Sequence, residues 1–188
     1  MARVLIVGDS ERRLTLAAAL LDAGHAVRVV ATQMAWPRAR AVTPNEAQEP
    51  SHLDPSRAPQ RGSGDGIEWF AGDPERLGTL RAAFEQVAVA CWLFGDHACN
   101  DHPGTALHGT LLEGFIRQIT DSSVRGLVYE VPADAAVPGG ERAGAALAGA
   151  MTARNSIPLA LIVAAPADEA DWLAQGIGAV ATVLGLDG

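Results

Sequence analysis

The residues best suited to chemistry gather in one short stretch, between positions 91 and 108. This stretch holds both cysteines and three of the five histidines, with two aspartates: Cys91, Asp96, His97, Cys99, Asp101, His102 and His108. Thiolates, imidazoles and carboxylates are all competent metal ligands, so a metal site is one interpretation. However, their spacing matches no standard zinc pattern, and Cys91 falls inside an apolar run, where a buried thiol is the ordinary explanation. We therefore expect a polar loop after a core cysteine, and no metal.

A second candidate for chemistry is Glu130, near the end of a predicted strand at 126–131. A carboxylate at the end of a central strand can have a perturbed pKa and serve as a general acid or base. The alternative interpretation is a carboxylate that is only hydrogen-bonded or solvated. The neighbouring Tyr129 is the only tyrosine, and we expect it to pack or to cap the sheet edge. The tryptophans Trp36, Trp69, Trp92 and Trp172 share no spacing and are interpreted as core or loop anchors.

A third candidate is the turn at 8–14, GDSERRL, which follows the apolar run 4–7. A helical pattern comes next, and its apolar stripe contains Leu14, Ala17, Ala18 and Leu21. Gly24 stands where a helix C-terminal glycine belongs, and a β-branched run follows at 27–30. This order predicts a βαβ unit of a parallel sheet, in which the turn after the first strand faces the ligand crevice.

Regular elements continue along the chain after a long interruption. The stretch 34–66 contains five prolines and no apolar period, so we expect an irregular or disordered insertion. Asp73 and Pro74 are suited to begin a helix, as N-cap and first helical residue. We predict strands at 67–71, 87–94, 126–131 and 159–164, and helices at about 73–86, 106–120, 141–154 and 168–184. Six strands alternating with helices indicate a single α/β domain with a Rossmann-like, doubly wound parallel sheet and helices on both faces.

Composition narrows the classes of function. The chain has 188 residues, 48% hydrophobic and 19% charged, as in a globular domain. Its net charge of -8 without a basic cluster argues against nucleic acid as a partner. No apolar run approaches the ~20 residues that span a bilayer, and with two cysteines and no signal-peptide pattern we expect a cytoplasmic setting. The sequence contains no lysine, which excludes a Schiff base, a P-loop lysine and a Tyr/Lys proton-transfer couple.

Five short motifs occur in a recognisable order outside 34–66. They are GHAV at 24–27, GD at 72–73, FG at 94–95, VRGLVYE at 124–130 and IPLALIVAAP at 157–166. In order and spacing the chain resembles the atypical and extended short-chain dehydrogenase/reductases, that is, the NAD-dependent epimerase/dehydratase and NmrA-like proteins. The resemblance implies a bound NAD or NADP, without a clear preference, since the second strand ends in ATQ and not in an acidic residue.

This resemblance suggests which residues line a dinucleotide site. They are Gly8, Ser10, Arg12, Arg13, Thr32, Asp73 and Gly95, with Arg12 and Arg13 available to pair with phosphate. In such proteins the helix at 141–154, here almost all small residues, often forms a homodimer interface; close packing on its own sheet is the alternative. The resemblance also implies that most of the C-terminal substrate region is missing.

The chain departs from the family in two places that bear on function. The family's turn has three glycines, one of which lets the pyrophosphate approach the backbone, whereas this chain keeps only Gly8 and adds Asp9 and Glu11. Glu130 occupies the position of the family's catalytic serine, and the Tyr-x-x-x-Lys pair is missing. Two functions therefore remain open: an NAD(P)-binding protein related to reductases and epimerases, and a non-enzymatic scaffold or regulatory relative that has lost the cofactor.

Overall fold

Six parallel strands form one sheet, in the order β3-β2-β1-β4-β5-β6. The computed structural model describes residues 1–31, 66–96, 102–132, 140–163 and 168–186. The strands are β1 (Arg3–Gly8), β2 (Ala26–Ala31), β3 (Ile67–Ala71), β4 (Val89–Leu93), β5 (Gly126–Glu130) and β6 (Leu159–Ile162). The helices are α1 (Arg12–Asp22), the 3-10 helix η2 (Leu77–Phe84), α2 (His102–Leu107), α3 (Thr110–Thr120), α4 (Gly140–Arg154) and α5 (Glu169–Leu184). The predicted fold class is confirmed. Three of the six predicted strands are shorter than predicted, by one or two residues at an end, while β1 and β2 are longer by one residue at each end.

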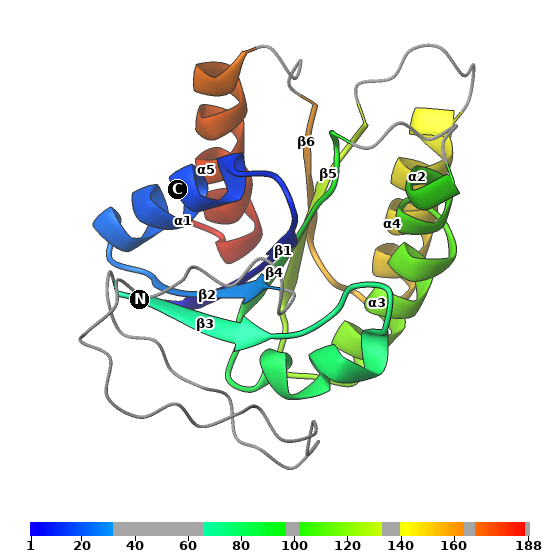
Figure 1. Cartoon of the computed structure of the whole chain (residues 1–188), viewed down its shortest axis with the longest axis horizontal. Helices are drawn as coiled ribbons and strands as arrows, with labels where there is room; N and C mark the ends of the chain where they lie inside the picture. Colours follow the sequence, from blue (N-terminus) through cyan, green and yellow to red (C-terminus); the bar gives the residue numbers. More distant parts are fainter. Residues whose placement is uncertain (32–65, 97–101, 133–139, 164–167, 187–188) are drawn as a thin grey trace, which may run out of the picture.

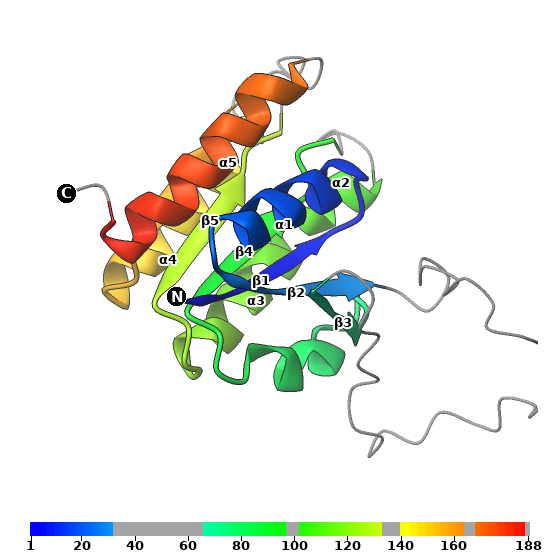
Figure 2. The same ribbon diagram turned by 90° about the vertical axis from the view of Figure 1, so that its left-hand side faces the viewer.

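Helices cover both faces of this sheet, as expected for parallel strands. Figure 1 shows α1 and α5 against one face and α2, α3 and α4 against the other, and Figure 2 shows α1 and α5 side by side. Side chains alternate along each strand and therefore build two cores. In β1, Leu5 and Val7 join the core under η2, α3 and α4, whereas Val4 and Ile6 join the core under α1 and α5. None of the helices in the described ranges is long and apolar enough to cross a membrane.

Helix α1 ends as predicted but presents a slightly different face to the sheet. Gly24 has a φ of 83°, and the N–H groups of Gly24 and His25 donate to Leu21 and Leu20, which is the Schellman arrangement. The fully buried residues are Leu16, Ala17 and Leu20, while Ala18, predicted on the buried stripe, is exposed. A stripe rich in alanine does not determine which face of the helix turns toward the sheet. Packing against α5 and the sheet determines it.

The predicted helix at 73–86 was wrong in type and in its start. Asp73 does not begin a helix: its Oδ1 accepts from the Glu75 N–H at 2.9 Å, and its own N–H donates to Thr79 Oγ1 at 2.8 Å. These bonds close an irregular turn, so that only the 3-10 helix η2 follows, beginning at Leu77. Local side-chain bonds of this kind compete with helix formation.

The single helix predicted at 106–120 is two helices, α2 and α3. The chain breaks at Gly109, whose φ of -121° and ψ of -104° lie outside the helical region. The buried ring of His108 holds the break, with Nδ1 at 2.8 Å from Tyr129 Oη and Nε2 at 3.2 Å from the carbonyl oxygen of Phe94. Tyr129 is therefore fully buried on β5 and packs in the core, not at a sheet edge.

The small residues of α4 let this helix pack closely on its own sheet. A Cβ at Gly144 would collide with the hydroxyl of Tyr129 and would lie 3.2 Å from the His108 carbonyl oxygen. Only glycine fits there. Packing against its own sheet is therefore observed, and a homodimer through α4 stays a prediction.

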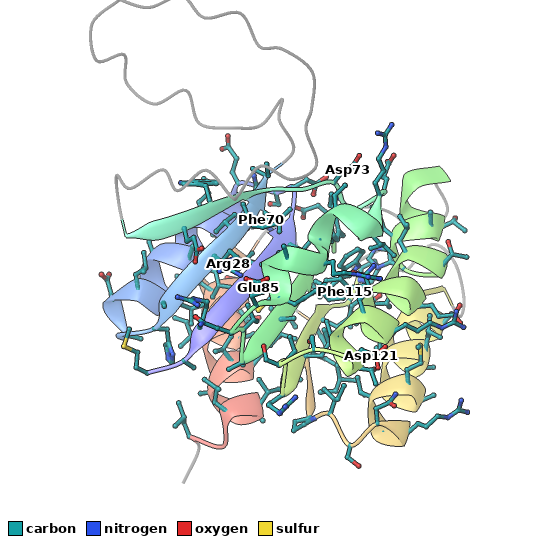
Figure 3. The ribbon with its side chains drawn as sticks, turned by 90° about the horizontal axis from the view of Figure 1, so that it is seen from below. Arg28, Phe70, Asp73, Glu85, Phe115 and Asp121 are labelled. Atoms are coloured by element: carbon teal, nitrogen blue, oxygen red, sulfur yellow. The ribbon has the colours of Figure 1, made fainter. Side chains whose placement is uncertain are left out.

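An arginine that the sequence did not single out joins β2 to η2. Arg28 is only 5% exposed, and its Nη2 lies 2.9 Å from Glu68 Oε1 on the neighbouring strand. Its Nη1 donates to the carbonyl oxygens of Ala83 and Glu85, at the end of η2. Figure 3 shows Arg28 beside Glu85. A cation bound to the last carbonyl groups of a short helix stabilises that helix end.

Candidate functional site

The candidate site lies where β1, β4 and β5 end, in the middle of the sheet. The chain leaves β1 toward β2 and leaves β4 toward β5, so the direction of winding reverses between β1 and β4. In doubly wound sheets ligands bind outside the carboxyl ends of the strands at this switch point. Figure 1 shows β1 and β4 next to each other at the centre of the sheet.

Glu130, the last residue of β5, is buried at this point and is 4% exposed. Because side chains alternate, Tyr129 points toward α4 and Glu130 points toward α1 and α5. Its Oε2 accepts from the Gly95 N–H at 2.8 Å, and its Oε1 accepts from Trp172 Nε1 at 2.6 Å. Burial raises the pKa of Glu130, while the hydrogen bonds from Gly95 and Trp172 and the charge of Arg12 act in the opposite direction.

Arg12, the first residue of α1, carries the cation of the site. Its Nη2 pairs with Asp96 and lies 3.3 Å from Glu130 Oε1. The guanidinium also lies over the ring of Trp172, 4.9 Å from its centroid, a cation–π geometry. Its Nη1 is buried and has no hydrogen-bond partner among the described residues. Arg12 therefore links α1, β5, α5 and the loop after β4, and it retains one unused donor.

Three N–H groups at the start of α1 are used within the turn. The N–H of Arg12 donates to Ser10 Oγ at 3.3 Å, that of Arg13 to Ser10 O at 3.2 Å, and that of Leu14 to Glu11 O at 2.9 Å. In a glycine-rich turn the corresponding groups are directed at a pyrophosphate. Here the guanidinium of Arg12 is the donor that reaches the switch point.

The two glycines of the site fit against protein atoms. A Cβ at Gly8 would collide with the carbonyl oxygen of Leu93, its register partner on β4. A Cβ at Gly95 would lie 2.5 Å from Cδ of Glu130. Both positions therefore require glycine, and the space beside Gly95 is filled by the Glu130 carboxyl group.

The predicted site residues separate into two groups. Ser10, Arg12, Gly95 and Glu130 come together around the switch point, with Gly8 at its edge. Arg13 turns back, with its Nη1 donating to Ser10 O at 2.8 Å, and burial lowers its pKa below the usual value of an arginine. Asp73 bonds within its own turn after β3. Thr32 lies outside the described residues, as does almost all of the predicted insertion at 34–66.

Sequence reasoning missed two members of the site, Asp96 and Trp172. Asp96 was considered only as a metal ligand, and Trp172 only as an anchor of the core or a loop. Trp172 comes from α5, whose first turn is set by Asp168, the N-cap that accepts from the Asp171 N–H at 2.9 Å. No sequence signal joins a tryptophan at 172 to a carboxylate at 130, because the contact depends on how α5 packs.

The interpretation of Cys91 as a buried core thiol is confirmed. Cys91 is fully buried on β4, and burial raises the pKa of its thiol to about 12. Within the described ranges, no group of histidine, cysteine and carboxylate side chains could hold a metal ion. His97, Cys99 and Asp101 lie outside those ranges, and of His102 only the helical backbone is described.

The burial of Cys91 predicts an unreactive thiol. In a Cys99→Ser variant, which leaves Cys91 as the only cysteine, we expect less than about a tenth of the thiol to react with a thiol reagent in the native state at pH 8, because thiolate is the reactive form. Full reaction is expected in denaturant. A spectrophotometric thiol titration measures both, and rapid native labelling would contradict the burial.

A cavity of about 820 Å³ lies at the opposite edge of the sheet, away from this site. It is lined partly by the charged residues Arg81, Glu85, Arg117 and Asp121, and Figure 3 shows Glu85 and Asp121 on this side. The lining contains both acidic and basic groups, and Arg117 already pairs with Glu113 at 2.5 Å. This cavity therefore shows no preference for one ligand charge.

The site is better suited to bind a single anionic group than to bind a whole dinucleotide. The unused Nη1 of Arg12 suits a phosphate or carboxylate oxygen. The turn, in contrast, lacks the glycine that lets a pyrophosphate approach the backbone, and Glu130 fills the space beside Gly95. Any dinucleotide would be held mainly through Arg12.

Comparison with solved structures shows that this chain shares the Rossmann fold. A Rossmann-fold NAD(P)-binding family protein from Shigella flexneri matches 86% of the chain with a TM-score of 0.53 and 12% identity. A UDP-glucuronic acid 4-epimerase from Bacillus cereus, solved with NAD, matches 85% with a TM-score of 0.51 and 9% identity. An epimerase from Methanothermobacter thermautotrophicus matches 85% with a TM-score of 0.54 and 12% identity.

These similarities confirm the predicted fold. The sequence identities are too low to show more than the fold. The chain spans 66%, 55% and 50% of the lengths of these three proteins. No family profile and no curated protein matches the sequence.

Proposed function

We propose that this protein is a Rossmann-fold nucleotide-binding protein that takes NAD(P), or a smaller adenine nucleotide, at the carboxyl edge of its sheet. The position of the Arg12 guanidinium carries this proposal: it lies at the switch point with one buried donor unused. Arginine is the side chain best suited to phosphate, because it offers several donors in a fixed plane. It would supply here the anion binding that a glycine-rich turn supplies elsewhere.

We do not propose hydride transfer by the mechanism of the short-chain dehydrogenases. Glu130, in the serine position, bonds to the Gly95 N–H, Trp172 and Arg12, and Tyr129 is buried against His108. With no lysine in the chain, no side chain can lower the pKa of a tyrosine in the usual way. Among the described residues Glu130 is the buried candidate acid or base at the site, in a place where burial raises its pKa.

A second function, a scaffold that has lost its ligand, is favoured by the carboxyl groups around Arg12. When both are ionised, Glu130 and Asp96 place two negative charges against one guanidinium. A phosphate would meet a net negative cluster, which opposes its binding. In this case the site is a structural ion-pair network.

A titration with nucleotides separates the two functions. If the site binds nucleotide, NAD, NADH, NADP, NADPH or ADP should raise the melting temperature in a concentration-dependent way, because a ligand that binds only the folded state stabilises it. Calorimetry should give a dissociation constant in the micromolar to millimolar range, and Arg12→Ala should weaken binding about tenfold or more, as expected for loss of a charge-assisted bond. Arg81→Ala, at the opposite edge, is the control. No shift with any of the five at millimolar concentration would favour the scaffold.

A further inference from the structure

The two carboxylates that pair with Arg12 are held very differently. Glu130 is buried and accepts from the Gly95 N–H and Trp172 Nε1 as well as from Arg12. The side chain of Asp96 is 38% exposed and lies on the loop after β4, where it pairs with the same Nη2. Glu130 is therefore a fixed partner, because removing its charge would leave buried donors unpaired. Within the described part of the chain Asp96 pairs with Arg12 alone, and its side chain is partly exposed, so it can be replaced.

The guanidinium itself is preorganised and does not depend on Asp96 for its position. It lies over the Trp172 ring at 4.9 Å, its Nε lies 3.5 Å from Ser10 Oγ, and Glu130 lies on one side. An arginine fixed by its neighbours loses little freedom when it exchanges one anionic partner for another. The exposed side of Arg12, where Asp96 lies, is the side from which a ligand can approach.

We propose that Asp96 is a built-in competitor for this anion site, and that a phosphate group of a ligand binds by taking the place of the Asp96 carboxylate on Arg12. The exchange leaves the Arg12–Glu130 pair in place and lets the ligand reach the neighbouring unused Nη1. It also sets a selectivity: the group that displaces Asp96 must carry more charge, or more acceptor oxygens, than a carboxylate does. The inference rests on the proposed function, since it concerns the same site.

The test is calorimetric titration of the whole chain with inorganic phosphate and with ADP, at one ionic strength and pH. We expect Asp96→Asn to bind both about fivefold more tightly than the unchanged protein, the effect of removing a partly exposed ion-pair partner. Asp121→Asn removes the same charge at the C-terminal end of α3, at the opposite edge of the sheet, and should leave both constants unchanged. In an Arg12→Ala/Asp96→Asn double variant the gain should disappear. Circular dichroism and the melting temperature establish that each variant is folded.

The outcomes separate this inference from the proposed function. If the unchanged protein binds ADP and Asp96→Asn binds it equally or more weakly, the competitor role is wrong and the nucleotide site stands. If Asp96→Asn binds and the unchanged protein does not, the competitor role is supported and the native site is closed to nucleotides. If neither binds at millimolar concentration, both are wrong. If Asp121→Asn also binds about fivefold more tightly, the effect comes from the net charge of the protein, and the proposed exchange of Asp96 for phosphate is wrong.

Discussion

Glu130→Leu should lower the free energy of unfolding by about 3 kcal/mol, since it leaves buried donors without their acceptor and removes one of the two carboxylates that pair with Arg12. The donors that lose their partner are the Gly95 N–H and Trp172 Nε1, and Arg12 keeps only Asp96. Urea denaturation followed by circular dichroism measures the change. Glu113→Leu is the matched control: it removes a glutamate that pairs with Arg117 on the exposed surface of α3 and should cost no more than about 1 kcal/mol.

The cost of losing Glu130 should also depend on pH. Burial raises its pKa, so the folded protein binds the proton more tightly than the unfolded chain does. The stability that comes from this group is therefore complete below the unfolded pKa of 4.5 and is lost as pH rises through the folded pKa. The difference between the unchanged protein and Glu130→Leu should be larger near pH 4.5 than at pH 8. A difference that grows with pH would mean that the hydrogen bonds outweigh the burial.

Two glycine-to-alanine substitutions on α4 should have opposite effects on the stability of the protein. Gly144→Ala should destabilise the protein by about 1–3 kcal/mol, the usual cost of overpacking a core, because the new Cβ collides with the Tyr129 hydroxyl. Gly149→Ala, one and a half turns further along α4, meets nothing within 4 Å. It should stabilise by about 0.5–1 kcal/mol, the difference in helix propensity. Thermal and urea unfolding of the two variants measure both effects.

A second substitution tests the reason given for Gly144. Adding Tyr129→Phe to Gly144→Ala removes the hydroxyl that the new Cβ would strike, so part of the lost stability should return. The recovery should be incomplete, because the buried His108 then loses the bond between its Nδ1 and Tyr129 Oη. If Gly144→Ala and Gly149→Ala have the same effect, α4 does not pack on β5 as closely as the structure describes.

Local patterns in the sequence were enough to predict the architecture. Apolar runs of strand length, a helix between them, and Gly24 at the helix end predict a βαβ unit, since each depends on neighbours in the chain. The helix predicted at 73–86 failed because of local bonds around Asp73, whereas two other predictions failed where a distant contact decided the conformation. The break at Gly109 depends on His108 reaching Tyr129 on β5, and the exposed Ala18 depends on how α1 meets α5.

The same division holds for the candidate site. The sequence by itself determined that only Gly8 remains of the glycine-rich turn, that no lysine is available, and that Glu130 ends a central strand. Only the tertiary structure decided that Arg12 spans the switch point between Glu130 and Asp96 and lies over Trp172. The physical reason is distance along the chain: these groups are separated by tens of residues, and a parallel sheet with its crossover helices brings them to one edge.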